Sequence, residues 1–278
     1  MSVFGRRRWL AIVLALIVVA LAVGLLGLSR EGAHNDLAPG LSVTEVRIDN
    51  ANAYLVHDPS DSAQALLIDS GAPGGGAQLA QRIREAGVLP QDIKVVILTH
   101  GHYDHAGGAR YLQETYGVPV IMGAGDAEAL ATGREQAVCP TSWLAERIAG
   151  EAGDAKAWAL TPDQVVTDSL SLGDIPGIGF EGELRVLGGH TPGSIVAVIG
   201  NSVFVGDLVR GSLWGSGPEV HFFMCDLDGN ARDLDRLLDT LPPVVTRVFP
   251  GHMSAFSRNA LRRHIDHRLA AIPAEDEQ

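Results

Sequence analysis

Four separate stretches of this chain place a histidine or an aspartate shortly after a largely apolar run and beside a glycine. The first follows the run 94–98 and holds three histidines and one aspartate within positions 100–105. The other stretches contain His190, Asp207 and His252. Short apolar runs of this kind predict buried strands, and strand ends at a sheet edge usually carry function. The four stretches therefore predict one polar site at the edge of a sheet.

The first stretch has the residue types of a metal site. Alternate residues of an extended segment share a face, so His100 and His102 can bind one ion together. The chain is then expected to bend, so that Asp104 and His105 can address a second centre, while the glycines at 107–108 let the backbone turn closely beneath the site. A histidine-rich surface turn is the alternative for this stretch alone, and the three other strand-end sites argue against it.

The apolar periodicity predicts strands in clusters with helices between them. Expected strands lie at 42–48, 54–57, 66–68, 94–98, 119–121, 184–187, 195–199, 203–205 and 244–249. Expected helices lie at 78–86, 107–116, 143–149, 230–238 and 259–271, with a further short helix capped by Asp126. This order favours layered α/β sheets flanked by helices over a regular βαβ alternation.

The N-terminus predicts a membrane-directed segment. Three arginines at 6–8 precede an uncharged apolar run at 9–28, which as a helix would span roughly 30 Å, the thickness of a bilayer core. Basic flanks tend to stay in the cytoplasm, which puts the rest of the chain outside it. We expect a cytoplasmic basic tail at 1–8, a transmembrane anchor or signal segment at 9–28, a linker at 29–40 and one folded domain at 41–278.

Two fates of this segment remain open. Ala20, Leu21 and Ala22 resemble a small-residue cleavage site, which would give a secreted protein. We favour a retained helix with the domain in the periplasm or outside the cell, because cleavage would leave the apolar stretch 23–28 as a new terminus.

The charge of the chain limits the kinds of substrate it can bind, and its two cysteines allow at most one disulfide. Four of the 21 basic residues and none of the 33 acidic ones lie in the first thirty positions, so the remainder carries a formal net charge of −16. Such a surface repels phosphate backbones, which argues against nucleic acid and for a small-molecule substrate. Cys139 and Cys225 either pair or remain two unpaired small apolar residues. Nothing in the sequence indicates the oligomeric state.

The order of these motifs resembles the metallo-β-lactamase superfamily. The matching motifs are His-x-His-x-Asp-His, Gly-His-Thr-Pro-Gly-Ser, Gly-Asp and Gly-His, and the likeness covers about residues 41 to 255. It implies a four-layer αβ/βα sandwich, here preceded by one N-terminal transmembrane helix, with a dinuclear metal cleft along one edge.

The resemblance also implies a role for each candidate residue. His100, His102 and His190 would hold the first metal, and Asp104, His105 and His252 the second. Asp207 would bridge both metals, and Asp69, within the matching Leu-Ile-Asp-Ser-Gly at 67–71, would support a ligand histidine.

These ligands suit two Zn²⁺ ions per chain, with iron or manganese as alternatives because carboxylate oxygens are harder ligands. Two such cations can turn a shared water into a bridging hydroxide at neutral pH, with Asp104 as a proton shuttle to the leaving group. The resemblance implies hydrolysis of an ester, thioester or lactone, because true metallo-β-lactamases generally lack the bridging aspartate found here at Asp207.

Other assignments stay open. An iron-dependent oxidoreductase resembling the persulfide dioxygenases, a β-lactamase-like amide hydrolase and a binding module without activity are alternatives. Tyr103 could touch substrate or pack beneath the metal loop, and His221 could line the cleft or pack in the interior.

Overall fold

The structure is a computed structural model, and it describes residues 34–148 and 158–272. The expected basic tail at 1–8 and membrane segment at 9–28 lie outside these residues. Across the described part of the chain, no helix combines the length and the apolar character needed to cross a membrane. The structural description below concerns the unit that begins at His34.

Two sheets form the middle of this unit. The first has seven strands in chain order: β1 (His34–Ala38), β2 (Leu41–Glu45), β3 (Tyr54–Asp58), β4 (Asp61–Ile68), β5 (Ile93–Ile97), β6 (Val120–Gly123) and β7 (Gln164–Val166). The second has six, in the order β15 (Phe256–Ser257), β14 (Arg247–Pro250), β11 (Ser202–Gly206), β10 (Ile195–Ile199), β9 (Gly182–Val186) and β8 (Ser169–Ser171). A small separate pair is formed by β12 (Arg210–Gly211) and β13 (Pro218–Glu219).

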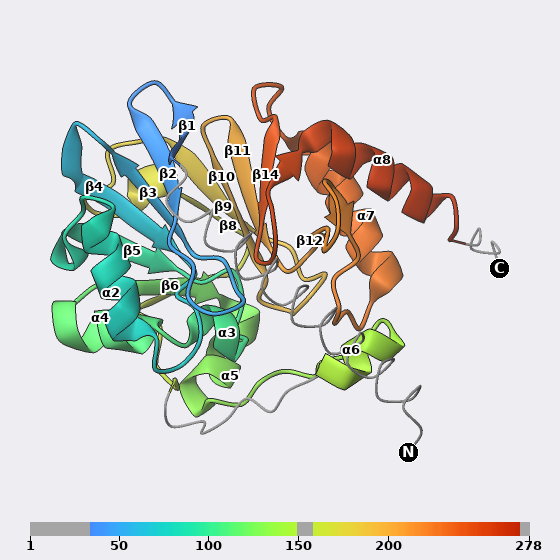
Figure 1. The fold of residues 1–278 in the computed structure, drawn as a ribbon, viewed down its shortest axis with the longest axis horizontal. Coiled ribbons are helices and arrows are strands. Elements are labelled where there is room, and N and C mark those ends of the chain that lie inside the picture. Colours follow the sequence, from blue (N-terminus) through green and yellow to red (C-terminus); the bar gives the residue numbers. More distant parts are fainter. Residues whose placement is uncertain (1–33, 149–157, 273–278) are drawn as a thin grey trace, which may run out of the picture. The chain divides into compact units, whose positions relative to one another are not determined.

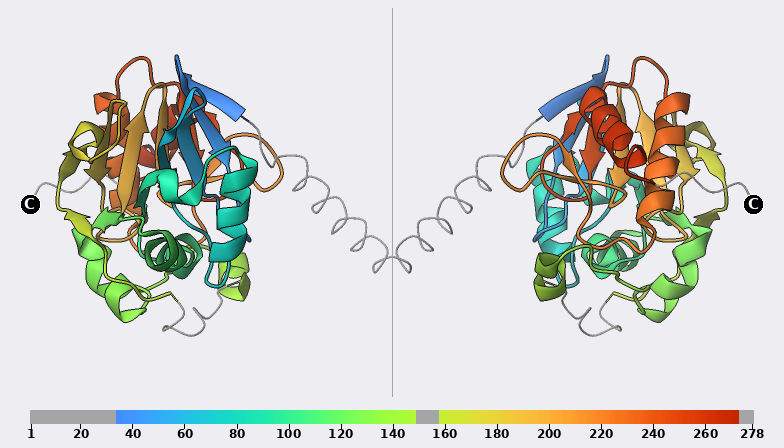
Figure 2. Two further views of the ribbon diagram at one scale, coloured as in Figure 1. Left: turned by 90° about the vertical axis from the view of Figure 1, so that its left-hand side faces the viewer. Right: turned by 90° about the vertical axis from the view of Figure 1, so that its right-hand side faces the viewer.

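Helices cover the outer face of each sheet (Figure 1, Figure 2). The first sheet is covered by α2 (Gly76–Glu85) and α4 (Ala109–Tyr116), and the second by α7 (Leu227–Thr240) and α8 (Arg258–Leu269). Shorter helices are α3 (Tyr103–Ala106), α5 (Ala127–Thr132) and α6 (Trp143–Ile148), with one-turn 3-10 helices at Pro90–Asp92, Ala124–Asp126 and Leu172–Asp174.

Side-chain alternation along β4 explains the layers. Leu66 and Ile68 point into the central core, where they join residues of the second sheet such as Phe204. Leu67 points to the opposite face and packs in the outer core with Leu79 of α2. Successive strand residues face opposite sides, so a continuous apolar run is needed where both faces are buried. The expected four-layer αβ/βα sandwich is confirmed.

Parallel strand pairs bring the candidate residues to one edge. Ile68 of β4 pairs with Ile97 of β5, and both strands continue directly into polar segments that hold Asp69 and the 99–108 stretch. Gly206 of β11 pairs in parallel with Pro250 of β14, so the segments that follow these two strands also leave the sheet side by side.

Several expected elements differ from those observed. The linker expected at 29–40 includes β1 from His34, and the strand expected at 42–48 ends at Glu45. The helix expected at 107–116 begins only at Ala109, as α4, and a separate short helix, α3, precedes it within the histidine-rich stretch. The strand expected from position 244 begins at Arg247, because Val245 donates its backbone N–H to Pro242 in a turn that leaves Val244 61% exposed.

Candidate metal centre

Three histidines and one aspartate from three separate loops form a first group. The Nδ1 atom of His102 lies 3.1 Å from Nε2 of His100 and 3.1 Å from Nε2 of His190. The Oδ2 atom of Asp207 lies 3.7 Å from His100 Nε2 and 3.8 Å from His190 Nε2. All four residues are buried, and their ligand atoms are close enough to hold one metal ion.

A second group lies beside the first. The Nε2 atoms of His105 and His252 are 3.2 Å apart, and Oδ2 of Asp104 lies 3.4 Å from His252 Nε2 and 3.9 Å from His105 Nε2. These three residues also bring one ligand atom each within reach of a common ion. The structure therefore brings together all the residues that the sequence predicted for the second metal.

Asp207 lies between the two groups. Besides its first-group contacts, its Oδ1 lies 3.4 Å from His105 Nε2 and its Oδ2 lies 3.4 Å from His252 Nε2. The close approach depends on Gly251, since a Cβ there would come within 2.3 Å of Asp207 Oδ1 and 2.6 Å of His105 Cε1. A carboxylate in this position can serve both groups at once, as predicted for a bridging ligand.

The outward-facing nitrogens of these histidines decide which atoms point into the site. The Nδ1 atoms of His190 and His252 contact the carbonyl oxygens of Phe223 at 3.1 Å and Asn50 at 2.9 Å. A carbonyl only accepts, so each Nδ1 carries a proton, and Nε2 is the atom that faces the centre and can bind a metal when it is unprotonated. Such outer contacts hold metal-binding histidines in their ligand tautomer.

His105 is held in the same way by Asp69. Its Nδ1 lies 2.9 Å from Asp69 Oδ2, and Asp69 also accepts hydrogen bonds from the backbone N–H and hydroxyl of Thr99 at 2.7 and 2.8 Å. Asp69 has the left-handed backbone conformation, with φ of 60°, where the chain turns out of β4. Asp69 therefore lies beside the candidate ligand His105, as the resemblance implied.

The pKa shifts of the histidines are consistent with a cation bound at each group. Burial lowers the pKa of His100 and His190 well below the ordinary value, so both rings are neutral and can act as ligands. Burial also acts to lower the pKa of His252, but Asp207 and Asp104 outweigh it and raise this pKa to about 10. Facing lone pairs at 3.2 Å need a proton or a cation between them, and the buried carboxylates supply the charge that stabilises either.

Asp126 has a role that the sequence did not predict. It was expected to cap a short helix, but its side chain makes no capping hydrogen bond to α5. Its buried carboxylate accepts hydrogen bonds from the backbone N–H groups of Gly101 and Gly193, both at 2.9 Å, and from the hydroxyl of Thr191. Asp126 does occupy the N-cap position of α5, as expected, but its carboxylate binds donors of two other loops and holds these loops together.

His221 joins the site from the segment between β13 and α7. Its Nε2 lies 3.1 Å from Oδ2 of Asp207, and His221, Asp207 and His252 form a third group that could hold an ion. The sequence left cleft lining and interior packing open for His221, and the structure favours the cleft. Tyr103 also lines the pocket, and it packs against the outer core that contains Leu67 and Leu79.

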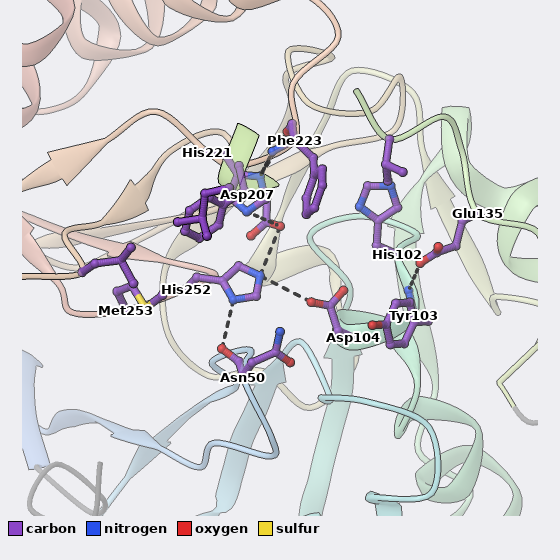
Figure 3. Close-up of a pocket in the computed structure, with 14 residues that line it drawn as sticks. Asn50, His102, Tyr103, Asp104, Glu135, Asp207, His221, Phe223, His252 and Met253 are labelled. Atoms are coloured by element: carbon purple, nitrogen blue, oxygen red, sulfur yellow. Dashed lines mark hydrogen bonds and ion pairs between the residues drawn. The ribbon is translucent and has the colours of Figure 1, made fainter. Parts of the chain in front are cut away.

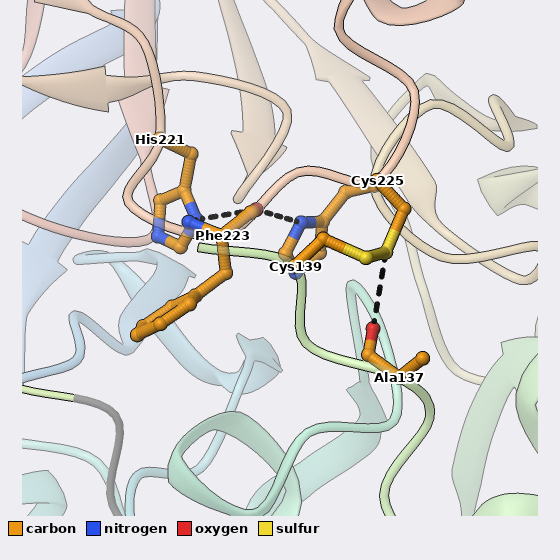
Figure 4. Close-up of a disulfide and its surroundings, with 6 residues drawn as sticks. Ala137, Cys139, His221, Phe223 and Cys225 are labelled. Atoms are coloured by element: carbon orange, nitrogen blue, oxygen red, sulfur yellow. Dashed lines mark hydrogen bonds between the residues drawn. A yellow bond between two sulfur atoms is a disulfide. The ribbon is translucent and has the colours of Figure 1, made fainter. Parts of the chain in front are cut away.

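Cys139 and Cys225, whose pairing the sequence left open, form a disulfide next to this segment (Figure 4). The disulfide joins the chain before α6 to the chain before α7. The residues beside it also pair through backbone hydrogen bonds, with Met224 N–H donating to Cys139 and Thr141 N–H donating to Phe222, each at 2.8 Å.

A pocket of about 330 Å³ opens above the two groups (Figure 3). Its floor holds His102, Asp104, Asp207, His221 and His252. Six apolar side chains from several segments also line it: Val138, Leu144, Leu213, Phe222, Phe223 and Met253. This volume is near the lower end of the range for small-molecule pockets, roughly 300 to 1,000 Å³. The site can thus admit a small substrate with an apolar part.

Comparisons with known proteins agree with this geometry. A family model described as the metallo-beta-lactamase superfamily matches residues 46–252. The chain is 33% identical over 171 residues to the hydroxyacylglutathione hydrolase GloC of Haemophilus influenzae, a match covering 57% of this chain and 69% of that one. It is 26% identical to the acyl-coenzyme A thioesterase MBLAC2 of Gallus gallus, covering 83% of this chain and 84% of that protein.

The match to the probable metallo-hydrolase YflN of Bacillus subtilis is 33% identical over 93 residues and spans only 34% of that protein. Among solved structures, the Rm3 metallo-beta-lactamase superposes with a TM-score of 0.60 at 19% identity, covering 86% of this chain and 91% of that chain. A metallo-beta-lactamase from Cronobacter sakazakii gives a TM-score of 0.60 at 19% identity, covering 89% and 95%. At this identity the structures show a shared fold.

Proposed function

Because this chain belongs to the metallo-beta-lactamase superfamily, we propose that it is a dinuclear zinc hydrolase that cleaves an ester, thioester or lactone bond of a small molecule. One observation carries the proposal: Asp207 lies between two complete groups of candidate ligands at the floor of a pocket. The donors are imidazoles and carboxylates without a thiolate, a set that suits zinc.

When bound, two zinc ions would lower the pKa of a shared water towards roughly 7 and polarise the scissile carbonyl. The residues of the chain supply positioning and proton transfer. Burial acts to raise the pKa of Asp104, but His105 and His252 outweigh it and lower this pKa, so Asp104 is ionised at neutral pH. Because Asp104 also lines the pocket, its carboxylate can take a proton from the attacking water and pass it to the leaving group.

Two relatives support this reaction class. One is named a hydroxyacylglutathione hydrolase and the other an acyl-coenzyme A thioesterase, and both names describe removal of an acyl group. The aspartate at position 207, implied by the resemblance to belong to the ester, thioester and lactone branches, points the same way.

We further propose that the catalytic unit lies outside the cytoplasm, anchored by the apolar segment 9–28 or released from it. The arginines at 6–8 support this orientation. The Cys139–Cys225 disulfide supports it independently, because disulfides persist mainly in oxidising compartments.

The test combines metal quantification with a substrate panel. We expect about two zinc ions per chain, as a dinuclear site requires, and hydrolysis of a chromogenic lactone, ester or thioester in preference to a β-lactam or a phosphodiester. His102→Ala and Asp207→Ala should lower the metal content and abolish turnover. Full activity in these variants after metal depletion would overturn the proposal, and one iron per chain would favour the oxidoreductase alternative.

A further inference from the structure

The apolar walls of the pocket form a surface of their own beside the ligand groups. Val138 and Leu213 line the pocket and leave 40% and 37% of their surface exposed. Leu144, Phe222 and Phe223 complete this apolar wall and are only partly buried. A ligand that covers these side chains would gain the free energy of removing apolar surface from water. The wall therefore favours an apolar group on the substrate.

Away from the ligand groups, the charges that line the pocket are unfavourable for an anionic substrate group. Glu135 lines the pocket, and its Oε1 accepts a hydrogen bond from the backbone N–H of Tyr103 at 3.1 Å. Among the described residues, no lysine or arginine lines the pocket. The guanidinium of Arg210 lies over the ring of Phe222 at 4.0 Å, but it is paired with Glu219 and lines a different hollow.

We propose that this pocket selects the apolar, uncharged acyl chain of a small ester or lactone and rejects acyl chains that carry a carboxylate. The inference rests on the proposed hydrolase function and adds its substrate class. The reacting carbonyl faces the ligand groups on the floor, and the acyl chain lies along the apolar wall. A carboxylate on that chain would lie near Glu135 without a counter-charge and would lose its hydration.

The test uses p-nitrophenyl esters with a constant leaving group. Along acetate, butyrate and hexanoate, we expect kcat/KM to rise by up to about fourfold per methylene until the wall is covered. The mono-p-nitrophenyl esters of succinic and glutaric acid, which end in a carboxylate, should react at least about tenfold more slowly than uncharged esters of equal length. Equal or faster hydrolysis of the carboxylate esters would overturn the inference.

Neighbouring residues on α6 provide a matched pair of variants. Leu144 lines the pocket, whereas the adjacent Trp143 is 74% exposed and lies outside it. Leu144→Ala should reduce the dependence of kcat/KM on chain length, and Trp143→Ala should leave it unchanged. Glu135→Gln keeps an acceptor oxygen for Tyr103 and should raise the relative rate of the carboxylate esters.

A binding measurement separates the two proposals. Calorimetry with hexanamide, an uncharged analogue that carries the acyl chain, needs no turnover. We expect binding to the metal-loaded protein that weakens roughly tenfold in Leu144→Ala and not in Trp143→Ala. If no ester, thioester or lactone is hydrolysed while hexanamide behaves in this way, the hydrolase proposal fails and the pocket assignment stands. Unchanged hexanamide binding in Leu144→Ala would refute the pocket assignment.

The disulfide carries a second, independent inference. Its partner segments are joined by the backbone bonds of Met224 and Thr141 described above, and the hydroxyl of Thr141 donates to the carbonyl of His221 at 2.9 Å. Between these bonds lies Phe223, whose carbonyl accepts from Nδ1 of His190 at 3.1 Å. We infer that the Cys139–Cys225 disulfide is a positioning element that keeps His190 in its ligand tautomer and orientation.

The double variant Cys139→Ser/Cys225→Ser tests this inference. By chelator competition, we expect one of the two metal sites to bind zinc about 10 to 100-fold more weakly, with the other unchanged. Ile265→Val is the control for general destabilisation. It alters the core between α8 and the second sheet, away from the site. If the double variant does not fold, Thr141→Val removes only the hydroxyl bonds of the same bridge and should weaken that site by a smaller factor. Unchanged zinc affinity in a folded double variant, or in Thr141→Val, would refute the inference.

Discussion

Thr191 donates a hydrogen bond of 2.6 Å from its hydroxyl to the carboxylate of Asp126, and so joins two loops whose residues lie 65 positions apart. The same carboxylate accepts the backbone N–H groups of Gly101 and Gly193. Gly101 lies between two candidate ligands, and Gly193 lies in the loop of a third. The distance between these ligands therefore depends on a residue that binds no metal itself.

We expect Asp126→Ala to weaken metal binding at the first group about 10 to 100-fold, because three buried donors lose their acceptor and the loops can separate. The free energy of unfolding should also fall, by about 3 kcal/mol. Zinc titration and denaturant unfolding measure the two effects. Asp163→Ala, which removes an acceptor for the Val120 N–H elsewhere, is the control and should lower stability alone. Normal metal affinity in Asp126→Ala would contradict this role.

Asp69→Asn should disable His105 as a ligand without changing the backbone. Asparagine tolerates the left-handed conformation found at this position, and its oxygen can still accept from Thr99. Its amide nitrogen, however, is a donor, so Nδ1 of His105 must accept and the ring proton moves to Nε2. We expect about 10 to 100-fold weaker binding at the second group, measured by chelator competition. Unchanged affinity would show that the Asp69 contact does not set the tautomer.

Metal binding should depend on pH through His252. The Asp207 and Asp104 carboxylates raise its pKa from the ordinary 6.5 to about 10 despite burial, so the metal-free protein holds this proton at neutral pH. The protonated ring stabilises the metal-free fold fully below pH 6.5, and this contribution is lost as the pH rises towards 10. A metal needs the unprotonated nitrogen, so metal affinity should rise over the same range.

Two measurements check this pH dependence. Calorimetric titration with zinc in buffers of different ionisation enthalpy should show proton release at pH 7. Denaturant unfolding of the metal-free protein should show a decreasing free energy of unfolding between pH 6.5 and 10. Zinc affinity that is constant across this interval would rule out displacement of a proton from His252.

Asn52 holds the loop that carries His252. Its Nδ2 donates to the carbonyl oxygens of Pro250 at 3.0 Å and Met253 at 2.8 Å, on either side of the histidine. We expect Asn52→Ala to weaken zinc binding at the second group by roughly tenfold. Tyr54→Phe removes the hydroxyl that bonds to Pro250 and to Asn52 but keeps both bonds from Asn52 to the loop, so it is the matched control and should cost about 1 kcal/mol of stability with little effect on zinc. Equal zinc affinities in both variants would contradict the assignment.

Local chemistry determined most of the order of elements. The run Leu66-Leu67-Ile68 predicted a strand because its β-branched and apolar residues leave no polar face, and the structure buries both faces between a helix layer and a second sheet. The change from an apolar run to a histidine-rich stretch after position 98 likewise marked a strand end. The motif order then implied the fold and the seven candidate ligands, which the structure brings together.

Apart from Asp69, only the tertiary structure decided which side chains hold these ligands in place. Asp126 looked like an ordinary helix cap, His221 like one histidine among several, and Cys139 and Cys225 like a pair that was free to bond or not. Their partners lie on other loops, up to 86 positions away for the disulfide. Periodicity describes one segment at a time, whereas such contacts depend on how two sheets and their loops approach each other, which is set by the packing of the whole core.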